Sequence, residues 1–374
     1  MWRFLLLIPL FIGYFFLPYR TGSSYTNLWF FTNPYFPVDH FLIFPWANFD
    51  GVHYLAIAGN GYTNDGRFFP FFPLLISLFS HLFGGDKAFS GIQFFTALFL
   101  SNLFFILGLF VFYKLIRLDF SEKIARLSIF FLLVFPTSFY FVSIYSESLF
   151  LFLTLSSFYF ARKKKWFLAG ILGMFLSATR IVGIAIFVAL LYEFFKTAQL
   201  GGVKKMFTRA LPILLVPFGL ISYMLFNLFR WGDPLYFLHA QGVLGNGRSV
   251  ESLVFPVQTV FRYFKILGTV SPVQYEWRIA LLEFFMFVLG VFLLYTAFRK
   301  KVCFSYILFS IISFLIPVLS GTLSGFPRYI LGLFPIYIAL AFIKNTKIKI
   351  LFGSFFLVLL FLLLMLFSRG YFVA

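Results

Sequence analysis

The sequence predicts an all-α protein that crosses a membrane several times, and three observations predict this fold class. Hydrophobic residues make up 61% of the chain and charged residues only 11%. The mean hydropathy is +0.96, and long apolar runs alternate with short basic clusters. Soluble domains are about half apolar and about a quarter charged. One soluble core could not bury this much apolar surface, whereas a bilayer accommodates it with helices as the spanning elements.

We expect about eleven spans, because a helix needs about 20 predominantly apolar residues to cross a bilayer. In chain order the candidate spans are Trp2–Tyr19, Gly91–Tyr113, Leu127–Val142, Ile144–Ala161, Trp166–Thr179, Ile181–Phe195, Ala210–Phe229, Trp277–Phe298, Cys303–Leu319, Tyr329–Ile343 and Ile350–Phe367. Polar residues divide two longer apolar stretches, at Tyr145–Ser148 and at Thr179-Arg180. Short, broken helices at membrane depth are tolerated where they line a protein cavity. We therefore expect a cavity near Glu147 and Arg180.

The net charge of +18 comes from basic residues in short clusters between apolar runs, for example Arg162–Lys165 and Arg299–Lys301. This spacing is typical of cytoplasmic loops under the positive-inside rule, and it argues against nucleic-acid binding, which needs a basic face on a soluble surface. The single cysteine, Cys303, excludes a disulfide within the chain.

The same rule predicts the orientation of the chain. With the N-terminus inside, most basic residues fall in inside loops and most acidic residues fall outside. Two outer segments are then long, residues 20–90 and residues 230–276, within one transmembrane domain spanning residues 1–374. Trp2–Tyr19 lacks a small-residue cleavage site, so we expect it to be a retained first span.

The first outer segment carries the residues best suited to chemistry. We expect a short helix from Phe49 to Ala58, ended by the stop signal Gly59–Gly61. Asp50, His53 and Tyr54 then lie at positions i, i+3 and i+4 and share one face of the helix. An acid, an imidazole and a phenol on one face can handle a sugar hydroxyl and a phosphate. Asp50 has a purely structural alternative, because aspartate is also favoured as a helix N-cap.

Arg67 follows this helix, with Asp65 just before it in a turn-forming sequence. The aromatic and proline-rich run Phe68–Pro73 comes next, and its prolines predict one rigid backbone path beside the site. The four histidines show no paired spacing, so the sequence predicts no metal site. No glycine-rich phosphate loop is present, and we expect no cofactor.

Several patches occur in a recognisable order. They are Asp50–Tyr62, which reads Asp-Gly-x-His-Tyr-x-x-Ile-Ala-x-x-Gly-Tyr, then Phe68–Pro73, Tyr145–Phe150 after Phe135-Pro136, Thr179–Gly183, and Pro327–Tyr329 followed by Pro335. Together they cover most of the chain, which resembles the PIG-V-type mannosyltransferases. That group contains the second mannosyltransferase of GPI-anchor synthesis and its prokaryotic relatives, within the GT-C membrane glycosyltransferases. The sequence departs from the family at Asn48-Phe49, where an Arg-Trp or similar pair is common.

The resemblance implies an inverting transfer of mannose from a polyprenyl (dolichyl) phosphate donor to a lipid-linked or glycan acceptor on the extracytoplasmic face. Asp50, at the position of the family acid, would be the general base. Arg180 and Arg328 are the first candidates for binding the leaving phosphate, and His53 and Arg67 are the second. The expected partners are membrane lipids, the donor and the acceptor. The expected location is the plasma membrane of a prokaryote or the endoplasmic reticulum of a eukaryote.

Three alternatives stay open at this point. Arg180 and Glu147 could form a structural ion pair, because a lone charge near membrane depth is costly. Another GT-C enzyme could share this layout and use a different sugar. A transporter or flippase of lipid-linked sugars is the alternative from a different class of protein. Such proteins place polar residues at mid-membrane, often within inverted repeats, whereas the charges of this chain cluster in the loops.

Overall fold

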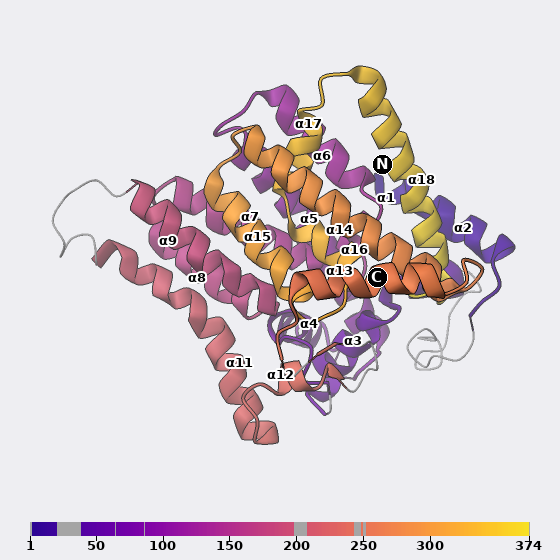
Figure 1. The fold of residues 1–374 in the computed structure, drawn as a ribbon. Coiled ribbons are helices and arrows are strands. Elements are labelled where there is room, and N and C mark those ends of the chain that lie inside the picture. Colours follow the sequence, from indigo (N-terminus) through magenta and orange to yellow (C-terminus); the bar gives the residue numbers. More distant parts are fainter. Residues whose placement is uncertain are drawn as a thin grey trace.

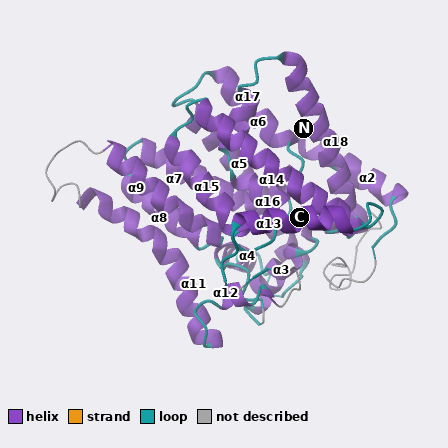
Figure 2. Ribbon diagram, viewed as in Figure 1, coloured by secondary structure: helices purple, strands orange, loops and turns teal. Residues whose placement is uncertain are grey.

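The computed structural model describes residues 2–20, 39–63, 65–85, 87–197, 208–242, 248–249 and 252–373. Helices account for 76% of the structure, and the described residues contain no strand (Figure 2). Four helices are long and apolar enough to cross a membrane: Gly91–Ile116, Thr208–Trp231, Tyr275–Arg299 and Thr346–Ser368. The prediction of an all-α fold is confirmed, and the apolar helices support an integral membrane protein. The number of about eleven spans stays a prediction.

The helices form one bundle, and three of the shorter ones, over Asp50–Asn60, Phe71–His81 and Tyr236–His239, lie together at one end (Figure 1). The longer helices are α2 (Leu7–Phe16), α5 (Gly91–Ile116), α6 (Glu122–Val134), α7 (Glu147–Arg162), α8 (Trp166–Ser177), α9 (Ala185–Thr197), α11 (Val216–Trp231), α13 (Pro256–Thr269), α14 (Tyr275–Arg299), α15 (Phe304–Val318) and α18 (Thr346–Ser368). The first outer segment adds α3 (Asp50–Asn60) and α4 (Phe71–His81), and shorter helices are α1 (Trp2–Leu5), α12 (Tyr236–His239), α16 (Phe326–Tyr329) and α17 (Pro335–Ala341).

The expected break between the third and fourth candidate spans is present. Helix α6 ends at Val134 and α7 begins at Glu147, and the connection is buried throughout. At 1.5 Å per residue the 13 residues of α6 and the 16 residues of α7 reach only about 20 and 24 Å. Both fall short of the ~30 Å hydrocarbon core. The connection therefore lies inside the protein, and Glu147, directly after it, lines the cavity described below.

The prediction of one continuous span over Tyr329–Ile343 is wrong. The chain there forms α16, a 3-10 turn at Ile330–Gly332, and the seven-residue α17. Pro335 is the first residue of α17, a position that proline favours because its missing amide would have no helical partner there. Within Phe68–Pro73, the run expected to form one rigid backbone path, helix α4 begins at Phe71 and includes Pro73.

Helices α8 and α11 approach closely because glycine lies at their contact. A Cβ atom added at Gly219 of α11 would lie 2.0 Å from the carbonyl oxygen of Met174 on α8. Small residues of this kind allow helix backbones to pack tightly in membranes. The contact fixes the end of α8, and the chain continues from there to Thr179 and Arg180.

The basic loops meet at the end of the bundle opposite the short helices. Arg162 at the end of α7 donates two hydrogen bonds of 2.6 Å to Asp119 in the α5–α6 connection. Its Nε also lies 3.4 Å from the buried Glu193 of α9. Ser305 at the start of α15 donates to Glu193 over 2.8 Å. Three predicted inside loops are thus joined at one end of the protein.

Candidate active site

Asp50 lies at the first residue of α3, after a strained turn. The preceding Phe49 has φ 60° and ψ −112°, an unusual conformation for a residue with a side chain. Neighbouring bonds hold this turn: the Asn48 side chain donates to the Phe367 carbonyl over 2.9 Å, and the Tyr145 hydroxyl donates to the Asn48 carbonyl over 2.8 Å. The Asp50 amide donates to the same Tyr145 oxygen over 3.3 Å. Such strain persists only where the surroundings enforce it, and it is concentrated at functional sites.

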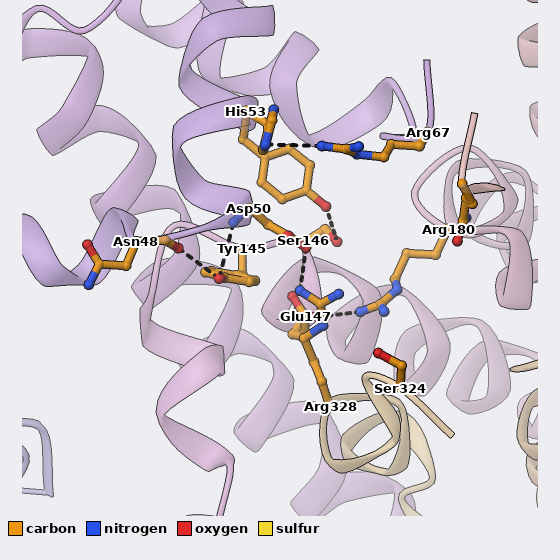
Figure 3. Close-up of polar contacts among 12 residues, drawn as sticks. Asn48, Asp50, His53, Arg67, Tyr145, Ser146, Glu147, Arg180, Ser324 and Arg328 are labelled. Atoms are coloured by element: carbon orange, nitrogen blue, oxygen red, sulfur yellow. Dashed lines mark hydrogen bonds and ion pairs between the residues drawn. The ribbon is translucent and has the colours of Figure 1, made fainter. Parts of the chain in front are cut away.

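The carboxylate of Asp50 pairs with Arg328 of α16 (Figure 3). The N-cap of α3 is Phe49, and the first turn has no side-chain cap. Asp50 is therefore not the N-cap of this helix, which was the structural alternative for this residue. Burial opposes ionisation of Asp50, but the nearby guanidinium groups, Arg328 foremost, outweigh burial and hold the pKa of the carboxyl below its usual range. Asp50 is an ionised carboxylate at neutral pH.

His53, one turn further along α3, lies between Asp65 and Arg67. Its Nδ1 is 2.8 Å from the Asp65 carboxylate, and its Nε2 is 3.1 Å from an Arg67 nitrogen. Arginine can only donate, so the arrangement assigns the proton to Nδ1 and a neutral imidazole to His53. Asp65 is a turn residue as expected, since its carbonyl accepts from the Phe68 amide, but its carboxylate also orients the histidine.

The α7 side of the site is built around Glu147. This residue is 4% exposed, and Arg180 donates to its Oε1 over 2.5 Å. The Nε of Arg328 lies 3.4 Å from the same oxygen. The ion pair between Glu147 and Arg180 that the sequence suggested is therefore present. Tyr54 contributes its hydroxyl, 3.0 Å from the Ser146 hydroxyl.

These groups line one cavity of about 230 Å³. All seven residues singled out from the sequence contribute to its wall: Asp50, His53, Tyr54, Arg67, Glu147, Arg180 and Arg328. They come from α3, the loop after it, α7, the α8–α9 connection and α16, so folding brings together positions up to 278 residues apart. The cavity holds both carboxylates that can accept a proton and guanidinium groups that can bind an anion.

The sequence reasoning missed several lining residues. These are Arg248 from the second outer segment, and Ser324 and Tyr329 from the region of α16. Gln241 of the second outer segment, a candidate for contact with the acceptor, also lines the cavity. Arg248 had no sequence signal, because it stands outside every recognisable motif. His239 of the second outer segment, a further candidate for contact with the acceptor, lies outside the cavity and forms an exposed pair with Asp233 at 2.6 Å.

Metal ligands do not gather at this site. Within the parts of the chain that the structure describes, no group of three or more histidine, cysteine, aspartate or glutamate side chains is arranged to hold a metal ion. The carboxylates Asp50 and Glu147 in the cavity are instead paired with Arg328 and Arg180.

Similarity to solved structures extends over nearly the whole chain. ArnT from Cupriavidus metallidurans, in a structure bound to undecaprenyl phosphate, has 14% identity and a TM-score of 0.50, covering 95% of this chain and 61% of that chain. The oligosaccharyltransferase of Archaeoglobus fulgidus, in a structure tethered with an acceptor peptide, has 15% identity and a TM-score of 0.47, covering 99% and 55%. This chain therefore spans less than two thirds of either protein. The likeness to ArnT shows the GT-C fold.

Comparison with curated protein sequences found no match. The sequence model of the family described as mannosyltransferase (PIG-V) does match, over residues 38–228. This region contains α3 to α9 and most of α11, and with them Asp50, His53, Arg67, Glu147 and Arg180. Because the match covers just over half of the chain, the protein belongs to the family described as mannosyltransferase (PIG-V).

Proposed function

We propose that this protein transfers mannose from a polyprenyl-phosphate mannose donor to a hydroxyl of a lipid-linked or glycan acceptor, with inversion at the anomeric carbon. One observation carries the proposal: an ionised carboxylate, Asp50, lies in a cavity together with the guanidinium groups of Arg67, Arg180 and Arg328. A general base and an anion-binding wall are the two groups that this reaction requires.

In the proposed reaction Asp50 accepts the proton of the acceptor hydroxyl as that oxygen attacks the anomeric carbon. The new carbon–oxygen bond forms on the face opposite the leaving group, the bond from the anomeric carbon to the phosphate oxygen breaks, and the lipid phosphate leaves with the bonding electrons. A β-linked donor thus gives an α-linked product. Base catalysis of this kind supplies about 10²- to 10⁴-fold in rate, and positioning and phosphate stabilisation supply the rest.

Arg328 has two tasks in this proposal. In the empty site it keeps Asp50 ionised, and with a donor bound its planar guanidinium is within the same cavity as the leaving phosphate. Arg180 stands on the other side of Glu147, so this one carboxylate holds both arginines in place. Glu147 is therefore a positioning residue, whereas His53, Tyr54 and Arg67 form the wall that would meet the sugar.

The choice of a lipid phosphate donor has support from the fold. The similar ArnT structure holds undecaprenyl phosphate, a lipid phosphate of the class proposed here. We propose no metal and no cofactor in the reaction, because the guanidinium groups can neutralise the leaving phosphate.

We further propose that the protein is a multi-pass protein of the plasma membrane or endoplasmic reticulum, with the cavity at the extracytoplasmic or lumenal end. The support is the separation of charges along the bundle. Arg162 and the neighbouring basic loops lie at the end opposite the cavity, as the positive-inside rule predicts for a cytoplasmic end.

The experiment is a transfer assay in proteoliposomes with radiolabelled polyprenyl-phosphate mannose and a lipid extract of the host as acceptor. Asp50→Asn keeps the shape of the side chain and removes the base, so transfer should fall by about 10²- to 10⁴-fold. Asp233→Asn is the matched control, because Asp233 is an exposed aspartate outside the cavity, and it should transfer normally. Labelled donor that crosses the bilayer unchanged, with no product, would replace this proposal with the flippase alternative.

A further inference from the structure

Arg248 differs from the other arginines of the cavity in its partners. Arg328 pairs with Asp50 and Glu147, Arg180 pairs with Glu147, and Arg67 lies 3.7 Å from a carboxylate oxygen. Arg248 instead donates to neutral oxygens, the side-chain amide of Gln241 and, over 3.1 Å, the backbone carbonyl of Ser324.

Among the described residues no carboxylate forms an ion pair with Arg248, and its buried Nε has no hydrogen-bond partner. Arg248 is partly buried, and a ligand of opposite charge would offset the cost of placing its guanidinium there without an ion-pair partner. The pKa of the nearby Tyr329 shows the effect of the positive charges around it. Burial raises the pKa of its phenol, but Arg248, Arg180 and Arg328 together lower it to about 8.

A second cavity adjoins the charged one at this arginine. It has a volume of about 320 Å³, and Ile181, Val182, Gln241, Arg248 and Tyr329 line both cavities. The rest of the second cavity is largely apolar, with Leu238, Leu253, Ile316, Pro317 and Leu319 in its wall. We call this second cavity the apolar groove. The serine hydroxyls in its wall form hydrogen bonds with nearby residues, because Ser249 donates to the Ser252 carbonyl and Ser320 donates to the Pro317 carbonyl.

Backbone hydrogen bonds fix the segment that carries Arg248 against the loop after α15. The Ser249 amide donates to the Ser320 carbonyl over 2.8 Å, and the Val254 amide donates to the Leu319 carbonyl over 2.9 Å. The Arg248 side chain itself donates to the Ser324 carbonyl. This bond and the two backbone bonds together hold Arg248 at the junction of the two cavities. A preorganised arginine of this kind loses little freedom when it binds an anion.

We propose that Arg248 binds the phosphate of the lipid donor, and that the apolar groove holds the isoprene units nearest to that phosphate. The inference rests on the proposed function for the identity of the lipid as a donor. Charge complementarity and position identify the occupant. The arginine lies between an apolar groove and a polar cavity. The donor has the matching order of groups, because its phosphate joins a long apolar chain to a polar sugar. The groove is too small for a whole polyprenyl chain, so the remainder of the chain lies in the bilayer.

The first test is binding of decaprenyl phosphate to the full-length protein in nanodiscs, with decaprenol and inorganic phosphate as separate probes. Arg248→Gln should weaken binding of decaprenyl phosphate about 10- to 100-fold, the effect expected for loss of a charge-assisted hydrogen-bonding group. Binding of decaprenol should not change. Arg262→Gln is the control, because Arg262 donates to the Gly321 carbonyl in the same region but lines neither cavity.

Equal binding by wild type and Arg248→Gln would overturn the phosphate assignment. Equal loss in Arg248→Gln and Arg262→Gln would also overturn it, because the effect would then come from a loosened loop. If inorganic phosphate binds as tightly as decaprenyl phosphate, the apolar groove has no part in binding and that half of the proposal is wrong.

The second test addresses the groove. Leu253 lines it and is 81% exposed, so Leu253→Gln should leave folding intact. It should raise KM for the polyprenyl-phosphate mannose donor and leave kcat unchanged. Val273→Gln, at an apolar residue that is 80% exposed and outside the groove, is the matched control. A raised KM for the acceptor lipid alone would assign the groove to the acceptor and contradict the proposal.

The two proposals fail separately. Asp50→Asn should bind decaprenyl phosphate like wild type while losing transfer. Decaprenyl phosphate could bind in a way that depends on Arg248 while no mannose is transferred. That result would support the lipid-phosphate site and contradict the proposed function. Transfer that is indifferent to Arg248→Gln would keep the function and remove the inference.

Discussion

Arg328 forms an ion pair with Asp50, a residue 278 positions earlier in the chain. The same guanidinium lies 3.4 Å from Glu147 on α7. One side chain therefore joins the first outer segment to the broken helices of the bundle. The pairing also sets the charge of the proposed base, because Arg328 is the strongest of the charges that offset the burial of Asp50.

The pH dependence of transfer should report this pairing. A carboxyl whose pKa is lowered stays ionised as the pH falls, until the lowered value is reached. The acid limb of kcat/KM, which reports the free enzyme, should therefore lie below about 3.9, the ordinary value for aspartate. Arg328→Gln removes the main charge that lowers this pKa and leaves the burial, so the acid limb should move to higher pH. Arg126→Gln, at an exposed pair near the basic end, should not move it. An unmoved limb in Arg328→Gln would show that another group titrates.

Glu147 should matter for stability as well as for positioning. Its replacement by glutamine removes the charge that faces both Arg180 and Arg328, and loss of one partner of a buried pair costs about 3–5 kcal/mol. Glu122 is the control, because its pair with Arg126 is exposed and such pairs contribute about 0–1 kcal/mol. Thermal unfolding in detergent compares Glu147→Gln with Glu122→Gln. Similar losses from both would contradict the account of a buried charge cluster.

Asp65 should act through His53. Asp65→Ala removes the acceptor that holds the Nδ1 proton, so the imidazole can rotate or change tautomer. Misplacement of this kind can cost up to about 100-fold in rate. Asp233→Ala breaks a similar aspartate–histidine pair outside the cavity and should leave the rate unchanged. Both variants should bind decaprenyl phosphate normally. A normal rate in Asp65→Ala would make His53 a structural residue.

The glycine contact between α8 and α11 is a test of the fold. Gly219→Ala places a methyl group 2.0 Å from the Met174 carbonyl, and forced packing of this size costs about 1–3 kcal/mol. Gly268→Ala in α13 meets no atom within 4 Å and should be neutral or slightly stabilising. The two variants are compared by thermal unfolding. If Gly219→Ala were as stable as wild type, α8 and α11 would not pack as described.

Local patterns in the sequence predicted much of this arrangement. The i, i+3, i+4 spacing placed Asp50, His53 and Tyr54 on one face of α3, and the polar residues around Glu147 marked the break between α6 and α7. These features depend on residues close together in the chain, so periodicity and polarity reveal them.

Features that depend on distant contacts could not be predicted in this way. Arg248 reaches the cavity because Ser249 and Val254 bond to the loop after α15, and no local pattern encodes that pairing. The carboxylate of Asp65 was given only a turn role, since its histidine partner became visible only once α3 and the following loop were in place. Tyr329–Ile343 looked like a span because it is apolar, although its residues are buried in protein.

The anomeric configuration of the product tests the central claim most directly. A β-linked polyprenyl phosphate [¹³C]mannose donor is supplied with the host lipid acceptor, and the new glycosidic bond is analysed by NMR. Direct attack by a hydroxyl that Asp50 deprotonates predicts an α-linked mannoside. A β-linked product would contradict the account, because retention requires a second nucleophile and a covalent intermediate on the enzyme.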